Sequence, residues 1–276
     1  MARPRLVTAI RLTVAAFREH NASRFGAALA FYIVFTIAPT LLIAIGIAGS
    51  LFGRPEAESA IIGRIAGSFG SAASNAVEAM IRSAASPRRS GWLATTIGVV
   101  TLLFGLSGVY RQIADALRAI WGVKAARDGG ARGIERRLAS MLLVTGAGAV
   151  VFLSVVADAA IAMTGKLAAS RLEGGEWLWH AAQLLVSTLV LTALFAAVFR
   201  YVAQVPVTWR DVTLGAAVTA VLFVIGKFAL GLYLGKAAVG SAYGAAGSVV
   251  VVLLWSYWSA QIFFFGLELT HVYATE

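Results

Sequence analysis

The chain has 276 residues, of which 59% are hydrophobic, with a mean hydropathy of +0.82 and a formal net charge of +10. This composition is too apolar for an ordinary soluble domain, and the absence of cysteine excludes disulfides, thiolate metal sites and thiol nucleophiles. The positive charge does not indicate nucleic-acid binding, because the arginines lie in segments that flank apolar stretches, where they suit the polar surface of a membrane.

Six apolar segments follow one another along the chain, and each reaches about the 20 residues that an α-helix needs to cross a bilayer. They cover residues 25–52, 91–110, 138–163, 177–200, 212–235 and 248–272. Three amphipathic segments accompany them, at residues 5–20, 57–84 and 110–122. The sequence therefore predicts an all-α polytopic membrane protein, in which residues 1–276 form a single domain of six transmembrane helices with amphipathic interfacial helices.

The amphipathic segments carry apolar residues at helical spacing on one face and polar residues on the other. In the first segment the apolar face comprises Leu6, Ile10, Val14 and Phe17. In the second it comprises Ile61, Ile65, Phe69, Ala73, Val77 and Met80. In the third it comprises Tyr110, Ile113, Leu117, Ile120 and Trp121, opposite Arg111, Asp115 and Arg118. Two interpretations fit these helices: anchors at the membrane surface, or gates over a cavity.

The lysines and arginines between the spans predict the orientation. The side that holds both termini carries fourteen of them, and the other side carries eight. Because cytoplasmic loops are enriched in lysine and arginine, we expect both termini and the 111–137 loop in the cytoplasm. The segment at residues 53–90, which holds five arginines, weakens the asymmetry.

Charged residues within or beside the spans are the first candidates for function, because a charge at the centre of a helix costs ~3 kcal/mol on insertion scales. Asp158 and Lys227 lie in two spans that both run outward, at depths that differ by roughly 7 Å, so the sequence predicts that they meet. Glu268 lies near the cytoplasmic edge of the last span, where Arg200 and Arg111 are its expected partners by depth. Structural ion pairs and a transport role explain these residues equally well.

Proline and glycine mark places where a span bends or packs closely. Pro39 lies within the first span and is expected to kink it. Small residues such as Gly46 and Gly49, Gly244 and Gly247 permit close contact between helices, and Gly266 stands two residues before Glu268. We interpret these glycines as packing positions rather than as substrate ligands.

The patterns that mark common enzymes are missing from the sequence. The three histidines, His20, His180 and His271, lie on different segments at no ligand spacing. No G-x-S-x-G, H-E-x-x-H or P-loop pattern occurs. The sequence therefore predicts no catalytic, cofactor-binding or metal site, and no ATP-driven activity.

Two longer motifs resemble signatures of the YihY/BrkB family of bacterial inner-membrane proteins. The family's first-span signature is similar to residues 26–39, GAALAFYIVFTIAP, and its last-span signature is similar to residues 243–273, YGAAGSVVVVLLWSYWSAQIFFFGLELTHVY. A third segment, ALRAIWGV at residues 116–123, resembles the family's segment after span two, although Arg118 stands where asparagine is common. The resemblance implies six helices in the inner membrane with both termini in the cytoplasm.

The same resemblance implies a suspected role in moving lipids or other amphipathic molecules. Members were once labelled ribonuclease BN, but this sequence has no carboxylate cluster that would hold a divalent metal and activate water. Two functions follow: a transporter or flippase-like conduit for a lipid or amphiphilic anion, or a non-transporting membrane scaffold in envelope biogenesis. The expected partners are membrane lipids, an amphiphilic substrate, and a second copy or another envelope protein, but not nucleic acid.

Overall fold

The computed structural model describes residues 6–69, 71–84, 92–122, 176–203, 208–236 and 247–275. Every regular element within these ranges is an α-helix, which confirms the predicted all-α class. The helices are α1 (Leu6–Glu19), α2 (Ala22–Phe52), α3 (Arg54–Phe69), α4 (Ser71–Ala84), α5 (Trp92–Trp121), α7 (Glu176–Ala203), α8 (Trp209–Lys236) and α10 (Gly247–Thr275).

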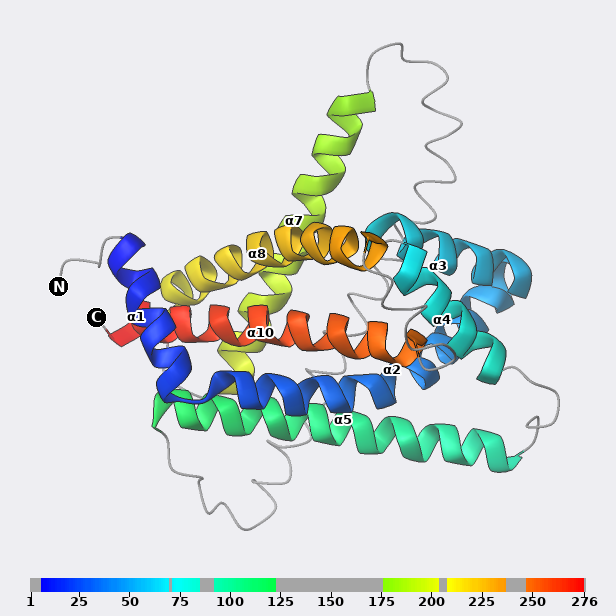
Figure 1. Ribbon diagram of the computed structural model, residues 1–276, viewed down its shortest axis with the longest axis horizontal. Helices are drawn as coiled ribbons and strands as arrows, with labels where there is room; N and C mark the ends of the chain where they lie inside the picture. Colours follow the sequence, from blue (N-terminus) through cyan, green and yellow to red (C-terminus); the bar gives the residue numbers. More distant parts are fainter. Residues whose placement is uncertain are drawn as a thin grey trace.

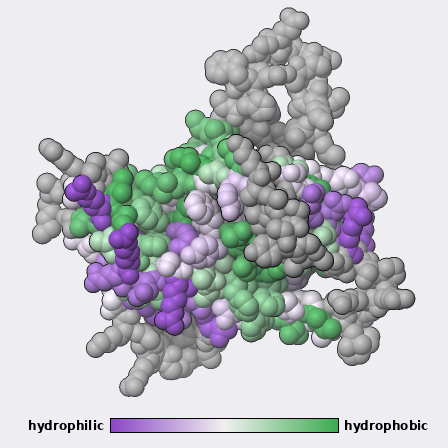
Figure 2. Space-filling model, in the orientation of Figure 1, coloured by the Kyte–Doolittle hydropathy of each residue, from purple (hydrophilic) through white to green (hydrophobic). Residues whose placement is uncertain are grey.

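Five of these helices are long and apolar enough to cross a membrane: α2, α5, α7, α8 and α10. Each coincides with one of the expected spans, and the remaining one, at residues 138–163, lies outside the described residues. Large apolar side chains such as Ile97, Leu185 and Leu232 are more than 60% exposed. Such a surface suits contact with lipid, and Figure 2 shows apolar residues over broad areas of the visible face.

Helix α10 is central to the described bundle (Figure 1). It contacts α1, α2, α4, α5 and α8, whereas α7 packs on α8 and α5. The largest buried cluster includes Phe264 and Leu267 of α10, Leu117 of α5 and Phe199 of α7. A helix that is apolar around most of its circumference can be buried in this way by several neighbours at once.

The two ends of α10 are covered by different elements. Near the C-terminal end of α10, α1 lies across the bundle, and the Phe17 and Phe265 rings are 6.2 Å apart. Near the N-terminal end, Ala76 of α4 is buried together with Val251 and Val252 of α10. Helix α1 and the α3–α4 pair therefore cover opposite ends of the bundle.

The expectation of one helix at residues 57–84 is wrong, because α3 and α4 are separate helices that pack against each other. In one continuous helix Ile61 and Val77 would be about 24 Å apart. In the structure they are buried in the same cluster, together with Ala44 and Ile45 of α2. Folding back buries the apolar face of both halves on the bundle, which a single helix lying on the membrane surface would not do.

The third amphipathic segment, at residues 110–122, is not a separate helix either, since α5 continues without a break from Trp92 to Trp121. Its apolar face is buried as predicted, with Ile113, Leu117 and Ile120 at most 6% exposed. Its polar face is also exposed as predicted, and Arg118 donates to Asp115 at 3.0 Å. The pattern identified the buried face correctly but not the continuity with the span.

Helix α1 is only partly the surface helix that its sequence predicts. Ala9 and Thr13 form its fully buried side, whereas Ile10 and Val14 of the predicted apolar face are 43% and 38% exposed. The Thr13 hydroxyl donates to the Ala9 carbonyl at 2.8 Å, so its burial leaves no unpaired donor. Small side chains on the buried side allow α1 to pack closely on the bundle, and the exposed Ile10 and Val14 suit contact with lipid.

The orientation can be tested with single cysteines, because the chain has none of its own. Asn75 on α4 and Ala274 near the end of α10 are both exposed and lie at opposite ends of the bundle. With both termini in the cytoplasm, we expect an impermeant thiol reagent to label Asn75→Cys but not Ala274→Cys in intact spheroplasts. The reverse labelling pattern would show that the orientation is inverted.

Candidate functional site

The candidate site is a buried carboxylate near the C-terminal end of α10. Glu268 is 0% exposed, and its Oε1 atom is 2.9 Å from Nδ1 of His20. The two residues are 248 positions apart in the sequence and meet because α1 lies across the end of α10. A buried carboxylate requires a hydrogen-bonding or charged partner, and His20 supplies it.

The chain turn between α1 and α2 places His20 against α10. Asn21, which separates the two helices, has φ 52° and ψ 39°, the left-handed conformation that asparagine adopts more readily than most residues. The amide of His20 closes the last turn of α1 by donating to the Ala16 carbonyl at 2.9 Å. His20 is therefore held at a sharp corner, where its side chain is 23% exposed on one side and bonded to Glu268 on the other.

Two further rings complete the site. The His271 ring centroid is 6.2 Å from that of His20 and 5.1 Å from that of Trp121 at the end of α5. Among the described residues, neither Oε2 of Glu268 nor Nδ1 of His271 has a hydrogen-bond partner, although both atoms are buried. Buried polar atoms without partners are uncommon in folded proteins, and they mark this cluster as a functional candidate.

A carboxylate beside two imidazoles can bind and exchange protons, because each of these side chains can both accept and donate a proton. A metal site is a weaker interpretation: the described residues contain no group of three histidine, cysteine, aspartate or glutamate side chains that could hold an ion. The chemistry available to Glu268, His20 and His271 is therefore proton binding or recognition of a cationic group.

The partners that depth alone suggested for Glu268 are wrong. The Arg200 guanidinium lies over the Trp209 ring, 5.6 Å from its centroid. Arg111 is exposed, and its Nε donates to the Ser107 carbonyl at 3.3 Å. Depth fixes a position along the membrane normal but not around it, and the side chain that pairs with Glu268 comes from the end of α1.

The expected pair of Asp158 and Lys227 cannot be followed, because Asp158 lies outside the described residues. Lys227 is half-buried on α8, and its Nζ atom is 5.2 Å from the centre of the Phe228 ring. Gly244 also lies outside the described residues, whereas Gly247 is the first residue of α10. The Asp158–Lys227 pair stays a prediction.

Pro39 lies inside α2, which remains a single helix from Ala22 to Phe52. Figure 1 shows the later part of α2 turning away from the line of its first part. Proline interrupts the backbone hydrogen bonding of a helix, so it accounts for a bend at this position. The bend directs the end of α2 towards the α3–α4 pair, which packs on it.

Gly266 lies where α8 and α10 interlock. Each helix has a glycine followed four residues later by a threonine whose hydroxyl donates to that glycine's carbonyl: Thr219 to Gly215 at 2.6 Å, and Thr270 to Gly266 at 2.9 Å. The threonine of each helix also lies against the glycine of the other. This arrangement satisfies both hydroxyls and brings the two helices into close contact immediately beside Glu268.

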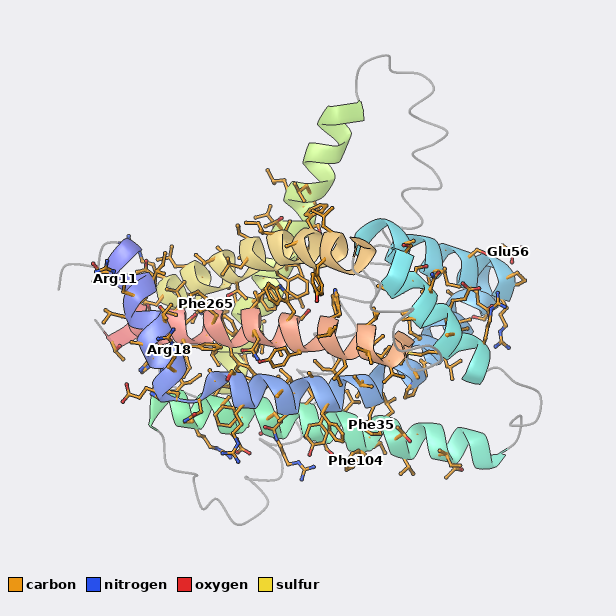
Figure 3. The ribbon with its side chains drawn as sticks, in the orientation of Figure 1. Arg11, Arg18, Phe35, Glu56, Phe104 and Phe265 are labelled. Atoms are coloured by element: carbon orange, nitrogen blue, oxygen red, sulfur yellow. The ribbon has the colours of Figure 1, made fainter. Side chains whose placement is uncertain are left out.

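The close-packing glycines are mostly not those that the sequence suggested. Around Gly46, no atom lies within 4 Å of where a side chain would begin, so Gly46 makes no close contact with a described helix. The second tight seam instead uses Gly105 and Gly108 of α5, which leave room for Tyr32 and Thr36 of α2. Outside this seam, Phe35 and Phe104 are 39% and 48% exposed, with ring centroids 6.2 Å apart (Figure 3).

His20 is the site residue that the sequence analysis missed, because it was assigned to a surface helix. A local signal existed for the other histidine: Glu268 and His271 are three residues apart and therefore share a face of α10. No comparable local signal connects His20 to them.

These features define the class of the protein: a multi-pass membrane protein of apolar helices, with an ionisable cluster buried at one end of its bundle. The chain belongs to the Virulence factor BrkB family, which matches residues 13–276. This confirms the family indicated by the motifs of the first and last spans.

Curated relatives are also membrane proteins by name. A UPF0761 membrane protein of Stenotrophomonas maltophilia (strain K279a) is 25% identical over 245 residues, which are 87% of this chain and 55% of the relative. A UPF0761 membrane protein of Xanthomonas axonopodis pv. citri (strain 306) is 26% identical over 261 residues, which are 93% and 59% of the two chains. The chain spans little more than half the length of these relatives. No solved structure matches the chain.

Proposed function

We propose that the protein moves a lipid or an amphiphilic anion across the bacterial inner membrane without using ATP. The buried Glu268, hydrogen-bonded to His20 within a bundle of apolar helices, carries the proposal. Ionisable groups inside membrane proteins are costly and commonly mark the path of a substrate or an ion. Of the three buried polar side-chain atoms without described partners, two belong to this cluster, on Glu268 and His271, and they support the same interpretation.

The charge around this site supports an anionic substrate. Figure 3 shows Arg11 and Arg18 on α1, next to the end of α10 that holds Glu268. The exposed arginines on the elements at this end are Arg11, Arg18, Arg24, Arg111, Arg118 and Arg210. Arginine side chains bind phosphate groups through paired hydrogen bonds, so this end of the bundle suits an anionic headgroup.

A second function, a non-transporting scaffold, is favoured by a different observation. The α8–α10 and α2–α5 seams are both closed by glycines that leave no room for a side chain. A closely packed bundle that presents apolar and aromatic residues to its surroundings can serve as a docking partner for other envelope proteins. The two functions differ in whether a lipid changes leaflet.

The test uses purified protein in liposomes that contain phosphatidylglycerol with a fluorescent headgroup. We expect the protein to move this lipid from the inner to the outer leaflet, where an impermeant quencher can reach it. Protein-free liposomes show only the outer-leaflet signal. A matching labelled phosphatidylcholine separates anion-selective movement from general leakage of the bilayer.

The control is the Arg82→Gln variant, because Arg82 pairs with Glu78 at the other end of the bundle. It should keep full activity, whereas Arg18→Gln combined with Arg11→Gln should lower the rate for the anionic lipid. The scaffold would be favoured if quenching never exceeded the outer-leaflet signal with either labelled lipid, and if a fluorescent soluble amphiphilic anion also stayed inaccessible to the quencher.

A further inference from the structure

The geometry around Glu268 shows more than a static ion pair. Oε1 faces Nδ1 of His20 at 2.9 Å, whereas Oε2 is buried without a described partner. His20 is the one member of the pair with access to solvent, through the exposed 23% of its side chain. The carboxylate therefore has one oxygen, Oε1, in contact with an imidazole and a second oxygen, Oε2, without a described partner.

We propose that Glu268, His20 and His271 form a proton-exchange site that controls how α1 is docked on α10. The site takes up a proton from the solution at the α1 end of the bundle through His20. This proposal does not depend on what the protein transports, since a scaffold could use the same site to change its shape.

The exchange itself is a single proton transfer. The N–H bond at Nδ1 of a protonated His20 breaks and an O–H bond forms at Oε1 of Glu268. The imidazolium becomes a neutral imidazole and the carboxylate becomes a neutral carboxylic acid, so the total charge of the pair does not change. The neutral ring keeps its hydrogen on Nε2, so a second proton from solution can bind only at Nδ1, where it breaks the hydrogen bond from the new Oε1–H group. His271 lies on the next turn of α10, with its ring 6.2 Å from that of His20.

The other charged groups around the site lie at the surface. They change the electrostatic potential at Glu268 and His20, but they do not take part in the proton transfer. Glu19 is exposed and adjacent to His20, and its negative charge acts on Glu268. The remaining charged groups that the packed elements carry at this end of the bundle are exposed or hydrogen-bonded at the surface. They are Arg11 and Arg18 on α1, Arg24 on α2, Arg111, Asp115 and Arg118 on α5, and Arg210 and Asp211 on α8.

The position of the site explains why protonation should move α1. His20 is the last residue before the left-handed Asn21, so it stands at the corner between α1 and α2. Helix α1 packs on α10, where the Phe17 and Phe265 rings are 6.2 Å apart, and the buried side of α1 consists of the small residues Ala9 and Thr13. Docking should be tightest where His20 is protonated and Glu268 is not, and it should weaken at both lower and higher pH.

Infrared difference spectroscopy of the protein in lipid nanodiscs tests the proton site directly. Lowering the pH should produce a carbonyl band of a protonated carboxylic acid, and this band should be lost in Glu268→Gln. Glu78→Gln is the control, because Glu78 pairs with Arg82 on the exposed side of α4. A wild-type spectrum identical to that of Glu268→Gln over the whole pH range of folded protein would overturn the proposal.

The movement of α1 is tested with spin labels at Ile10→Cys on α1 and Trp209→Cys on α8, both of which are exposed. The distance distribution should change with pH in the otherwise native protein, and this change should be lost in Glu268→Gln. If Glu268→Gln does not fold, His20→Gln replaces it, since it keeps a hydrogen-bonding side chain but cannot titrate. In His20→Gln the carboxylic-acid band should appear at a different pH from that in the wild type, and the pH-dependent change in distance should be lost. A distribution that does not depend on pH, or that depends on pH equally in the variants, would overturn the link to α1.

Discussion

Replacing Gly266 by alanine is expected to destabilise the bundle by about 1–3 kcal/mol or more. This is the usual cost of adding a methyl group to a closely packed interior. A Cβ at this position would lie 2.7 Å from the Cβ of Thr219 and closer still to its hydroxyl oxygen. Rotating the threonine moves the hydroxyl but not the Cβ, so the clash can be relieved only by separating α8 from α10. The thermal midpoint of the detergent-solubilised protein measures the effect.

Gly46→Ala is the matched control, because no described atom beyond its own stretch of helix backbone lies within 4 Å of the new methyl group. It should leave stability unchanged or raise it by up to about 1 kcal/mol, the helix propensity that alanine gains over glycine. Adding Thr219→Gly to Gly266→Ala should restore part of the lost stability, although it also removes a hydroxyl bond. Equal effects of Gly266→Ala and Gly46→Ala would mean that α8 and α10 do not meet as closely as described.

Most of the fold could be predicted from the sequence because it depends on local properties. The length and composition of the apolar segments identify α2, α5, α7, α8 and α10 as spans without knowledge of their neighbours. The split between α3 and α4 could not be predicted in this way. The apolar face of residues 57–84 suits one long helix or two short ones, and only packing on α2 and α10 decides between them.

The glycine contacts show the same limit. Both Gly46 and Gly266 lie within apolar spans, but Gly266 lies against Thr219, whereas Gly46 has open space. Sequence spacing says which residues share a face, whereas the rotation of each helix decides which face meets a partner. The prediction of the candidate site was incomplete for this reason. Glu268 was recognised as unusual, but the partner predicted for it was wrong, because the actual partner comes from α1 rather than from another span.

The largest effect is expected at the partner of that carboxylate. His20→Leu removes the described group that pairs with Glu268, so the fully buried carboxylate either stays charged without a partner or takes up a proton. The loss reaches the ~3–5 kcal/mol of a buried pair broken from one side where Glu268 stays ionised, and it is smaller where Glu268 is protonated. We therefore expect a sharp fall in the folded yield and thermal midpoint of His20→Leu at neutral pH.

The combined variant His20→Leu, Glu268→Leu decides whether this loss comes from the charge. Replacing both members of a buried pair by apolar residues is often neutral or stabilising, so the double variant should be clearly more stable than His20→Leu. The comparison is Arg82→Leu, which breaks an exposed pair with Glu78 and should cost no more than about 1 kcal/mol. If the double variant is as unstable as the sum of the two single variants, His20 and Glu268 are not coupled. The two residues would then stabilise the protein separately, and the site would lose the contact on which its chemistry depends.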